Sequence, residues 1–89
     1  MISKTTKVFR AALAALPEDV RRKAKKAYHL FCENPHHPSL RFKKVHSTLP
    51  VYSVRVGIDY RAVGVIRESN IIWFWVGSHA DYDAYLVRI

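Results

Sequence analysis

Six consecutive β-branched or aromatic residues, Ile71–Val76, most constrain how this chain can fold. A run that is apolar at every position is typical of an interior strand, so a layer must cover each face of the sheet that contains it. Gly77 permits a tight exit, and the spacing of Ser78 and Asp81 predicts that both side chains cap the first turn of a helix. His79 then lies at a helix N-terminus, where free amide groups favour a phosphate.

The first half of the chain predicts two helices. Thr6 is suited to cap the first helix, whose apolar residues recur at helical spacing until Pro17 stops the run. Pro17, Glu18 and Asp19 form the first turn of a second helix, which ends near Asn34–Pro35. The short link between them predicts a helical hairpin whose apolar stripes lie on one face of a sheet.

Segments of period two predict the sheet itself. They are separated by short turn sequences, which favours an antiparallel meander, and a weaker signal at Met1–Thr5 indicates a short edge strand. The sequence therefore predicts a single α+β domain spanning 1–89, in which an N-terminal helical hairpin packs on a twisted antiparallel β-sheet and a short helix follows at the C-terminus. The expected meander strands are Leu40–Val45, Val51–Val56, Arg61–Arg67 and Ile71–Val76.

The positions of the turns also predict which side chains meet. Arg55 should lie across from Arg61 or Ala62, and Arg61 in turn across from about Gly77. Because His79 follows at the same end, two arginines and one histidine are expected at one end of the sheet. The pairing predicts a shared end more firmly than a shared face, since a slip of one residue turns a side chain to the opposite face.

The charge balance indicates a polyanionic partner. Fifteen Lys and Arg against seven Asp and Glu give a formal net charge of +8, which favours nucleic acid, a membrane surface or an acidic protein. No apolar run approaches the roughly 18 residues of a membrane span, so we expect no membrane partner. Cys32 is the single cysteine, which excludes an intrachain disulfide and makes a cytoplasmic location the expectation. It stands among scattered histidines without the paired spacing of a zinc site, so we expect no metal and no cofactor.

The order of these elements, together with the segments Val51–Val56, Asp59–Val63 and Trp73–Tyr82, resembles the RelE/ParE superfamily of toxins from type II toxin–antitoxin pairs. The resemblance covers nearly the whole chain and implies the RelE-like microbial RNase fold, with the RelE/YafQ-like branch favoured. It implies a metal-independent, ribosome-dependent mRNA endoribonuclease that inhibits translation. The implied partners are mRNA on the ribosome and a cognate antitoxin, which would form a toxin–antitoxin hetero-oligomer.

Two alternatives stay open. The same superfamily contains ParE-type toxins that inhibit gyrase without nuclease chemistry, and a non-catalytic basic RNA-binding domain would also explain the fold and the charge.

The resemblance also assigns roles to individual residues. Arg61 falls on the strand arginine that RelE-type nucleases use at the scissile phosphate, and Arg55 falls on a basic position of the preceding strand. His79, in Gly-Ser-His-Ala-Asp, resembles the catalytic histidine of the YafQ-type Gly-Thr-His-Ser-Asp segment. Tyr85 lies roughly where RelE carries a C-terminal tyrosine. Ser53 stands where RelE has lysine and His79 where RelE has arginine, so the base and acid of RelE do not transfer directly.

The chemistry of RNA cleavage is consistent with these residue types. Attack by a 2′-hydroxyl on the adjacent phosphorus needs a base, positive charge on the phosphate oxygens and an acid for the 5′-oxygen. Histidine suits the proton transfers and arginine the phosphate. His46, which follows two lysines, is a candidate for a second proton-transfer group, and which group is base and which is acid stays open. Weaker candidates for contact with RNA or antitoxin are Lys43, Lys44, Ser53, Trp73, Trp75 and Tyr82, with the two tryptophans expected on one face of their strand.

Overall fold

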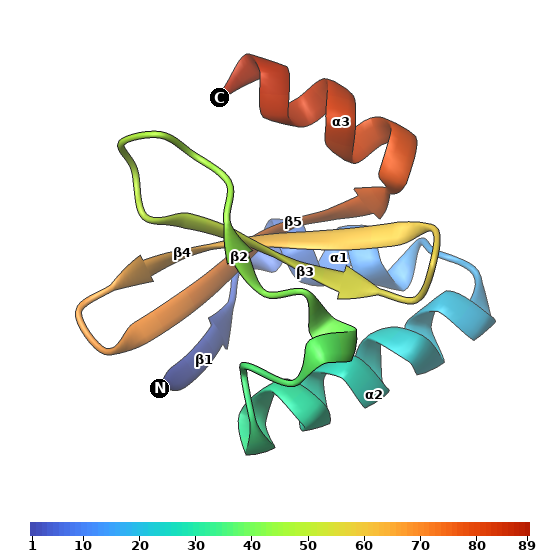
Figure 1. The fold of residues 1–89 in the computed structure, drawn as a ribbon. Coiled ribbons are helices and arrows are strands. Elements are labelled where there is room, and N and C mark those ends of the chain that lie inside the picture. The colour runs from blue at the N-terminus through green and yellow to red at the C-terminus, as the bar shows by residue number, and fades with distance from the viewer.

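The computed structural model describes residues 1–89 and places a β-sheet between two helical layers (Figure 1). Helices α1 (Lys7–Ala14) and α2 (Glu18–Glu33) cover one face, and α3 (His79–Arg88) lies over the other. This arrangement confirms the predicted α+β class, with a helical hairpin and a short C-terminal helix. None of the helices combines the length and the apolar character needed to cross a membrane.

The sheet has five strands in the order β1-β5-β4-β3-β2. Strands β2 to β5 form the predicted antiparallel meander, whereas β1 pairs in parallel with β5. The sheet is therefore mixed where the sequence predicted an antiparallel one. The helical hairpin carries the chain from β1 to β2 at the opposite edge, and the meander then brings β5 back beside β1 in a parallel orientation. The strands are β1 (Ile2–Thr5), β2 (Lys43–Lys44), β3 (Val51–Val56), β4 (Tyr60–Arg67) and β5 (Asn70–Ser78).

Local signals explain the helix starts. The Thr6 hydroxyl accepts a hydrogen bond of 3.0 Å from the amide of Phe9 and so caps α1, as predicted. The Ser78 hydroxyl accepts one of 3.2 Å from the amide of Asp81 and caps α3.

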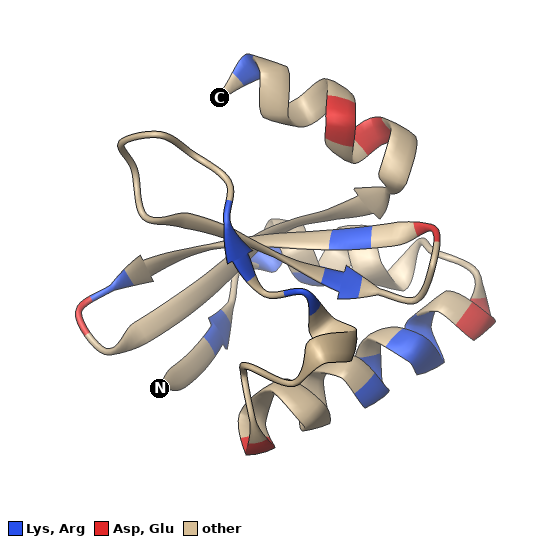
Figure 2. Ribbon diagram, in the orientation of Figure 1, with Lys and Arg blue, Asp and Glu red and all other residues tan.

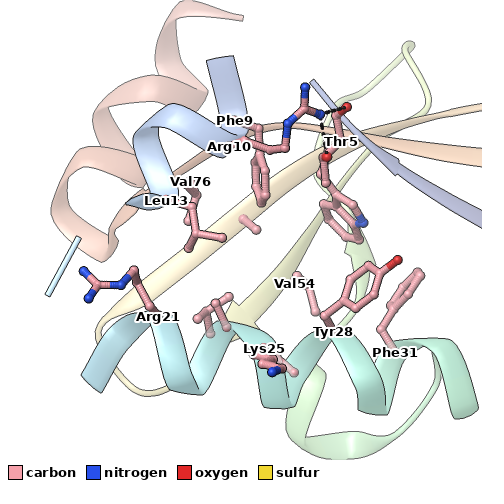
Figure 3. A pocket seen from close by; sticks show the side chains of 15 residues that line it. Thr5, Phe9, Arg10, Leu13, Arg21, Lys25, Tyr28, Phe31, Val54 and Val76 are labelled. Carbon is pink, nitrogen blue, oxygen red and sulfur yellow. Dashed lines mark hydrogen bonds between the residues drawn. The ribbon is translucent and has the colours of Figure 1, made fainter. Parts of the chain in front are cut away.

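The hairpin formed by α1 and α2 does not fill all the space above the sheet: an apolar cavity of about 390 Å³ remains between the two helices, with Phe9 and Phe31 among its walls (Figure 3).

The segment before β2 differs from the prediction of a strand at Leu40–Val45. Pro38–Leu40 forms a 3₁₀ helix, η1, and Arg41 adopts a left-handed backbone conformation with φ of 46°. Leu40 is only 1% exposed, because this turn inserts its side chain into the main core. Only Lys43–Lys44 is left to pair with β3, so β2 is a short edge strand.

A β-bulge corrects the predicted placement of the tryptophans. Trp73 lies opposite Gly64 and Trp75 opposite Val63, so Phe74 is an extra residue on β5. The bulge breaks the alternation of side chains. Trp73 packs in the main core beneath the hairpin, whereas Trp75 packs on the opposite face with the cluster beneath α3. The prediction that both tryptophans share one face was wrong for this reason.

Candidate functional site

A groove of about 690 Å³ lies where β2, β3 and β4 approach α3. Basic residues gather on these strands, and the acidic residues nearby belong to α3 and to a turn (Figure 2). Five Lys and Arg side chains line the groove, against a single carboxylate from Asp83. An unbalanced positive surface of this kind attracts polyanions. The basic lining residues are Arg41, Lys43, Lys44, Arg55 and Arg61.

The strand register confirms the predicted meeting of residues at this end of the sheet. Arg55 lies directly opposite Arg61, and Arg61 lies opposite Gly77. The amide of His79 donates a hydrogen bond of 2.6 Å to the carbonyl of Asp59 in the β3–β4 turn, which ties the start of α3 to that turn. Two guanidinium groups and one imidazole therefore line the same groove.

The two arginines are held by backbone carbonyls and form no ion pair with a carboxylate. Arg61 Nη1 donates to the carbonyls of Tyr60 at 2.8 Å and Ile58 at 3.2 Å, and Arg55 Nε donates to that of Gly57 at 3.2 Å. Burial, and next the charge of Arg55, lower the pKa of the Arg61 guanidinium. A partly desolvated pair of like charges without a counter-ion is suited to bind an anion that both groups contact.

His79 is oriented by a residue that the sequence reasoning missed. Its Nδ1 lies 3.1 Å from Asp83 Oδ2, one helical turn further along α3. With Nδ1–H donating to the carboxylate, the neutral imidazole carries its free electron pair on Nε2, which has no hydrogen-bond partner in the protein. The spacing of four residues on a predicted helix was the signal that could have identified Asp83.

A buried hydrogen bond forms the floor of the groove. The Tyr82 hydroxyl donates to Ser53 Oγ at 2.9 Å, and the two residues are 5% and 2% exposed. The Tyr82 ring also meets the His79 ring edge-on, with centroids 6.0 Å apart. This bond joins α3 to β3 beneath the arginines and the histidine. Ser53 and Tyr82 thus lie at the groove, with their hydroxyls bonded to each other.

The structure does not bring His46 into the groove lining. Its Nδ1 accepts hydrogen bonds from the amides of Thr48 at 3.2 Å and Leu49 at 3.0 Å, and its Nε2 lies 3.1 Å from the main-chain oxygen of Ile89. Both ring nitrogens are occupied in tying the loop before β3 to the end of α3.

Tyr85 and the two tryptophans also lie outside the groove lining. Tyr85 stacks on Trp75 with ring centroids 4.9 Å apart, and burial raises the pKa of its hydroxyl. Trp73 is 4% exposed within the main core.

Arg41 lines the groove, although the sequence does not identify it as a candidate. Its segment predicts a strand, whereas a left-handed turn positions its side chain.

The fold is shared with solved structures of RelE and YafQ proteins. A RelB–RelE antitoxin–toxin complex from Methanococcus jannaschii matches with a TM-score of 0.69 and 24% identity, over 92% of this chain and 96% of that chain. An archaeal RelE–RelB complex from Pyrococcus horikoshii OT3 matches with a TM-score of 0.69 and 21% identity, over 86% and 92%. YafQ from E. coli strain BL21(DE3) matches with a TM-score of 0.66 and 14% identity, over 90% and 94%.

The family model of the ParE-like toxin domain matches residues 18–84. The chain therefore belongs to the ParE-like toxin domain family, within the RelE/ParE superfamily that its sequence resembles. No curated protein matches the chain.

Proposed function

We propose that this protein is the toxin of a toxin–antitoxin pair and that it cleaves mRNA on the ribosome as a metal-independent endoribonuclease. The observation that supports the proposal best is the placement of His79, oriented by Asp83, in the same groove as two arginines that lack acidic partners. A proton-transfer group beside paired guanidinium groups supplies what phosphodiester cleavage by a neighbouring 2′-hydroxyl requires.

His79 serves the proton transfers in this proposal. In its neutral form, Nε2 accepts the proton of the 2′-hydroxyl while the 2′-oxygen forms a bond to phosphorus. The bond from phosphorus to the 5′-oxygen then breaks, which leaves a 2′,3′-cyclic phosphate and a 5′-hydroxyl. The departing 5′-oxygen needs one proton, and the protonated imidazole holds one, so a single histidine balances the reaction. Asp83 acts as a positioning residue, because its hydrogen bond to Nδ1 fixes the ring and leaves Nε2 free to accept a proton.

Arg55 and Arg61 neutralise the phosphate in this proposal. The pentavalent transition state carries more negative charge on its equatorial oxygens than the starting diester, and preorganised guanidinium groups stabilise that charge most. The turn carbonyls already hold both side chains, so little reorganisation is needed when the phosphate arrives. Lys43 and Lys44, both exposed on β2, extend the positive surface toward neighbouring phosphates.

The proposed partner is a cognate antitoxin that covers the groove. Two of the similar structures are complexes of RelE with RelB, which supports a protein partner of this kind. The formal net charge of +8 favours an antitoxin segment with acidic residues for the surface that otherwise meets RNA. We expect this function to be carried out in the cytoplasm, where ribosomes and mRNA are found.

Cleavage of a translated message tests the proposal. A reporter mRNA is translated in a cell-free system with the wild type, His79→Ala or Arg61→Ala, and cleavage sites are mapped by primer extension. We expect each substitution to slow cleavage by on the order of 100-fold or more, and Asp83→Asn to have a smaller effect. His29→Ala, at an exposed histidine on α2, is the matched control and should retain full activity. Full activity of both groove variants would refute the site.

A gyrase inhibitor is the second candidate, because the matching family model is that of the ParE-like toxin domain. In that case the positive groove serves binding alone and His79 transfers no proton. Growth arrest with DNA breaks and intact mRNA would favour this function. Arrest with cleaved mRNA and intact DNA would favour the nuclease.

A further inference from the structure

A second hollow, which we name the notch, lies beside the groove between α2, η1 and the β3–β4 turn. Its volume is about 330 Å³, within the range of small-molecule sites. Its walls include apolar side chains, among them Leu30 and Ile58, and three cationic side chains line it, those of Lys23, Lys26 and Arg55. An apolar surface with several cations and no carboxylate in its lining suits a ligand that is both flat and anionic.

The notch and the groove are adjoining parts of one surface, because Arg55 lines both. Arg55 Nε donates to the carbonyl of Gly57, which holds the guanidinium at the boundary. The side chain of Lys23 runs directly over the turn at Gly57. A Cβ atom at Gly57 would lie 2.9 Å from Cδ of Lys23, so the absence of a side chain there leaves room for the lysine. A nucleic-acid backbone that leaves the groove past Arg55 would therefore bring its next phosphate near Lys23.

We propose that the notch binds the next nucleotide of the strand, the one beyond the dinucleotide whose linkage is cleaved in the groove. The phosphate of that nucleotide lies on Lys23, Lys26 and Arg55, and its base packs on the apolar surface that includes Ile58 and Leu30. This inference rests on the proposed function for the identity of the strand. Ile58 is 72% exposed at the tip of a turn, so its side chain is accessible to a base.

Binding of short RNA strands of different length tests the notch. Oligonucleotides with 2′-O-methyl groups cannot be cleaved by 2′-hydroxyl attack, so fluorescence anisotropy with dimers and hexamers measures binding alone. Lys23→Gln/Lys26→Gln removes the cations of the notch. Arg22→Gln/Lys25→Gln removes the same charge from the same helix without touching the notch lining.

We expect the notch variant to bind the hexamer 5- to 10-fold more weakly than the control variant, and the dimer equally well. The slope of log affinity against log salt for the hexamer should also fall by about 0.7 for each phosphate contact that is lost. Equal losses in the two variants, or a loss that does not depend on strand length, would overturn the proposal, because a general effect of charge would then explain the binding.

A second pair of variants tests the apolar surface. Ile58→Ser should weaken hexamer binding several-fold, whereas Leu49→Ser, at a side chain 53% exposed on another loop, should not. Both residues are exposed, so the folds should persist, and circular dichroism checks this. Unchanged binding by Ile58→Ser would refute the base contact. A different outcome is that the wild type cleaves no mRNA while the notch variants still bind the hexamer more weakly than their controls. That result would refute the proposed nuclease function and would still support RNA binding in the notch.

Discussion

The hydrogen bond between Tyr82 and Ser53 can be tested by a double-mutant cycle. Tyr82→Phe leaves Ser53 Oγ, in a residue 2% exposed, without its partner, and Ser53→Ala leaves the Tyr82 hydroxyl unpaired. An unsatisfied buried group costs about 1–3 kcal/mol, so each single variant should lose about 1–2 kcal/mol of unfolding free energy. For a domain of this size, the midpoint of thermal unfolding should fall by roughly 4–8 °C for each kcal/mol.

The double variant should be more stable than the sum of the single losses predicts, because neither polar group is left alone. We expect a coupling energy of about 1 kcal/mol. Urea unfolding followed by tryptophan fluorescence measures all four proteins, and an unchanged m-value establishes that the same transition is compared. Additive losses, within roughly 0.3–0.5 kcal/mol, would refute the claim that this bond ties α3 to β3.

Three further predictions concern the bulge, alkaline stability and the cap of α1. Gly64→Ala places a Cβ atom 2.8 Å from the Trp73 ring and 3.1 Å from a backbone oxygen, and should cost about 1–3 kcal/mol in thermal unfolding; a neutral result would mean that the bulge relaxes freely. Burial raises the pKa of Tyr85 above 10.0, so its contribution to stability is complete below that pH and is lost as pH rises through the folded-state pKa. Tyr85→Phe should therefore reduce the loss of unfolding free energy at alkaline pH, measured by urea titration. An equal loss in the variant and the wild type would contradict this. Thr6→Ala removes the hydrogen bond to the Phe9 amide and should cost about 0.5–2 kcal/mol in the same assay, whereas Thr48→Ala, in an exposed loop, should cost little.

The convergence of Arg55, Arg61 and His79 could be predicted because it depends on local information. Turn positions set the pairing of adjacent antiparallel strands, so the register of a meander follows from strand lengths. The end of β5 and the start of α3 were equally local, given Gly77 and the cap at Ser78. The sequence alone therefore predicts the three main side chains of the groove.

The features that were missed depend on contacts that sequence patterns do not carry. The bulge lets Trp73 fill the core beneath the hairpin while Trp75 stacks on Tyr85, and its position is set by packing on both faces of the sheet. The left-handed turn at Arg41 follows from the insertion of Leu40 into the core. Both are tertiary effects that override local preference.

The charge arrangement of the groove links stability to function. Like charges placed directly opposite on neighbouring strands oppose folding, and Arg55 and Arg61 occupy such positions without an ion pair to either guanidinium group. An anion bound between them removes this penalty, so any occupant of sufficient charge also stabilises the folded chain by mass action. An RNA phosphate and the carboxylates of an acidic protein segment would satisfy the same two guanidinium groups. On the proposed function, substrate and antitoxin therefore compete for the same two guanidinium groups. The repulsion between these groups in the free protein favours the binding of either anion.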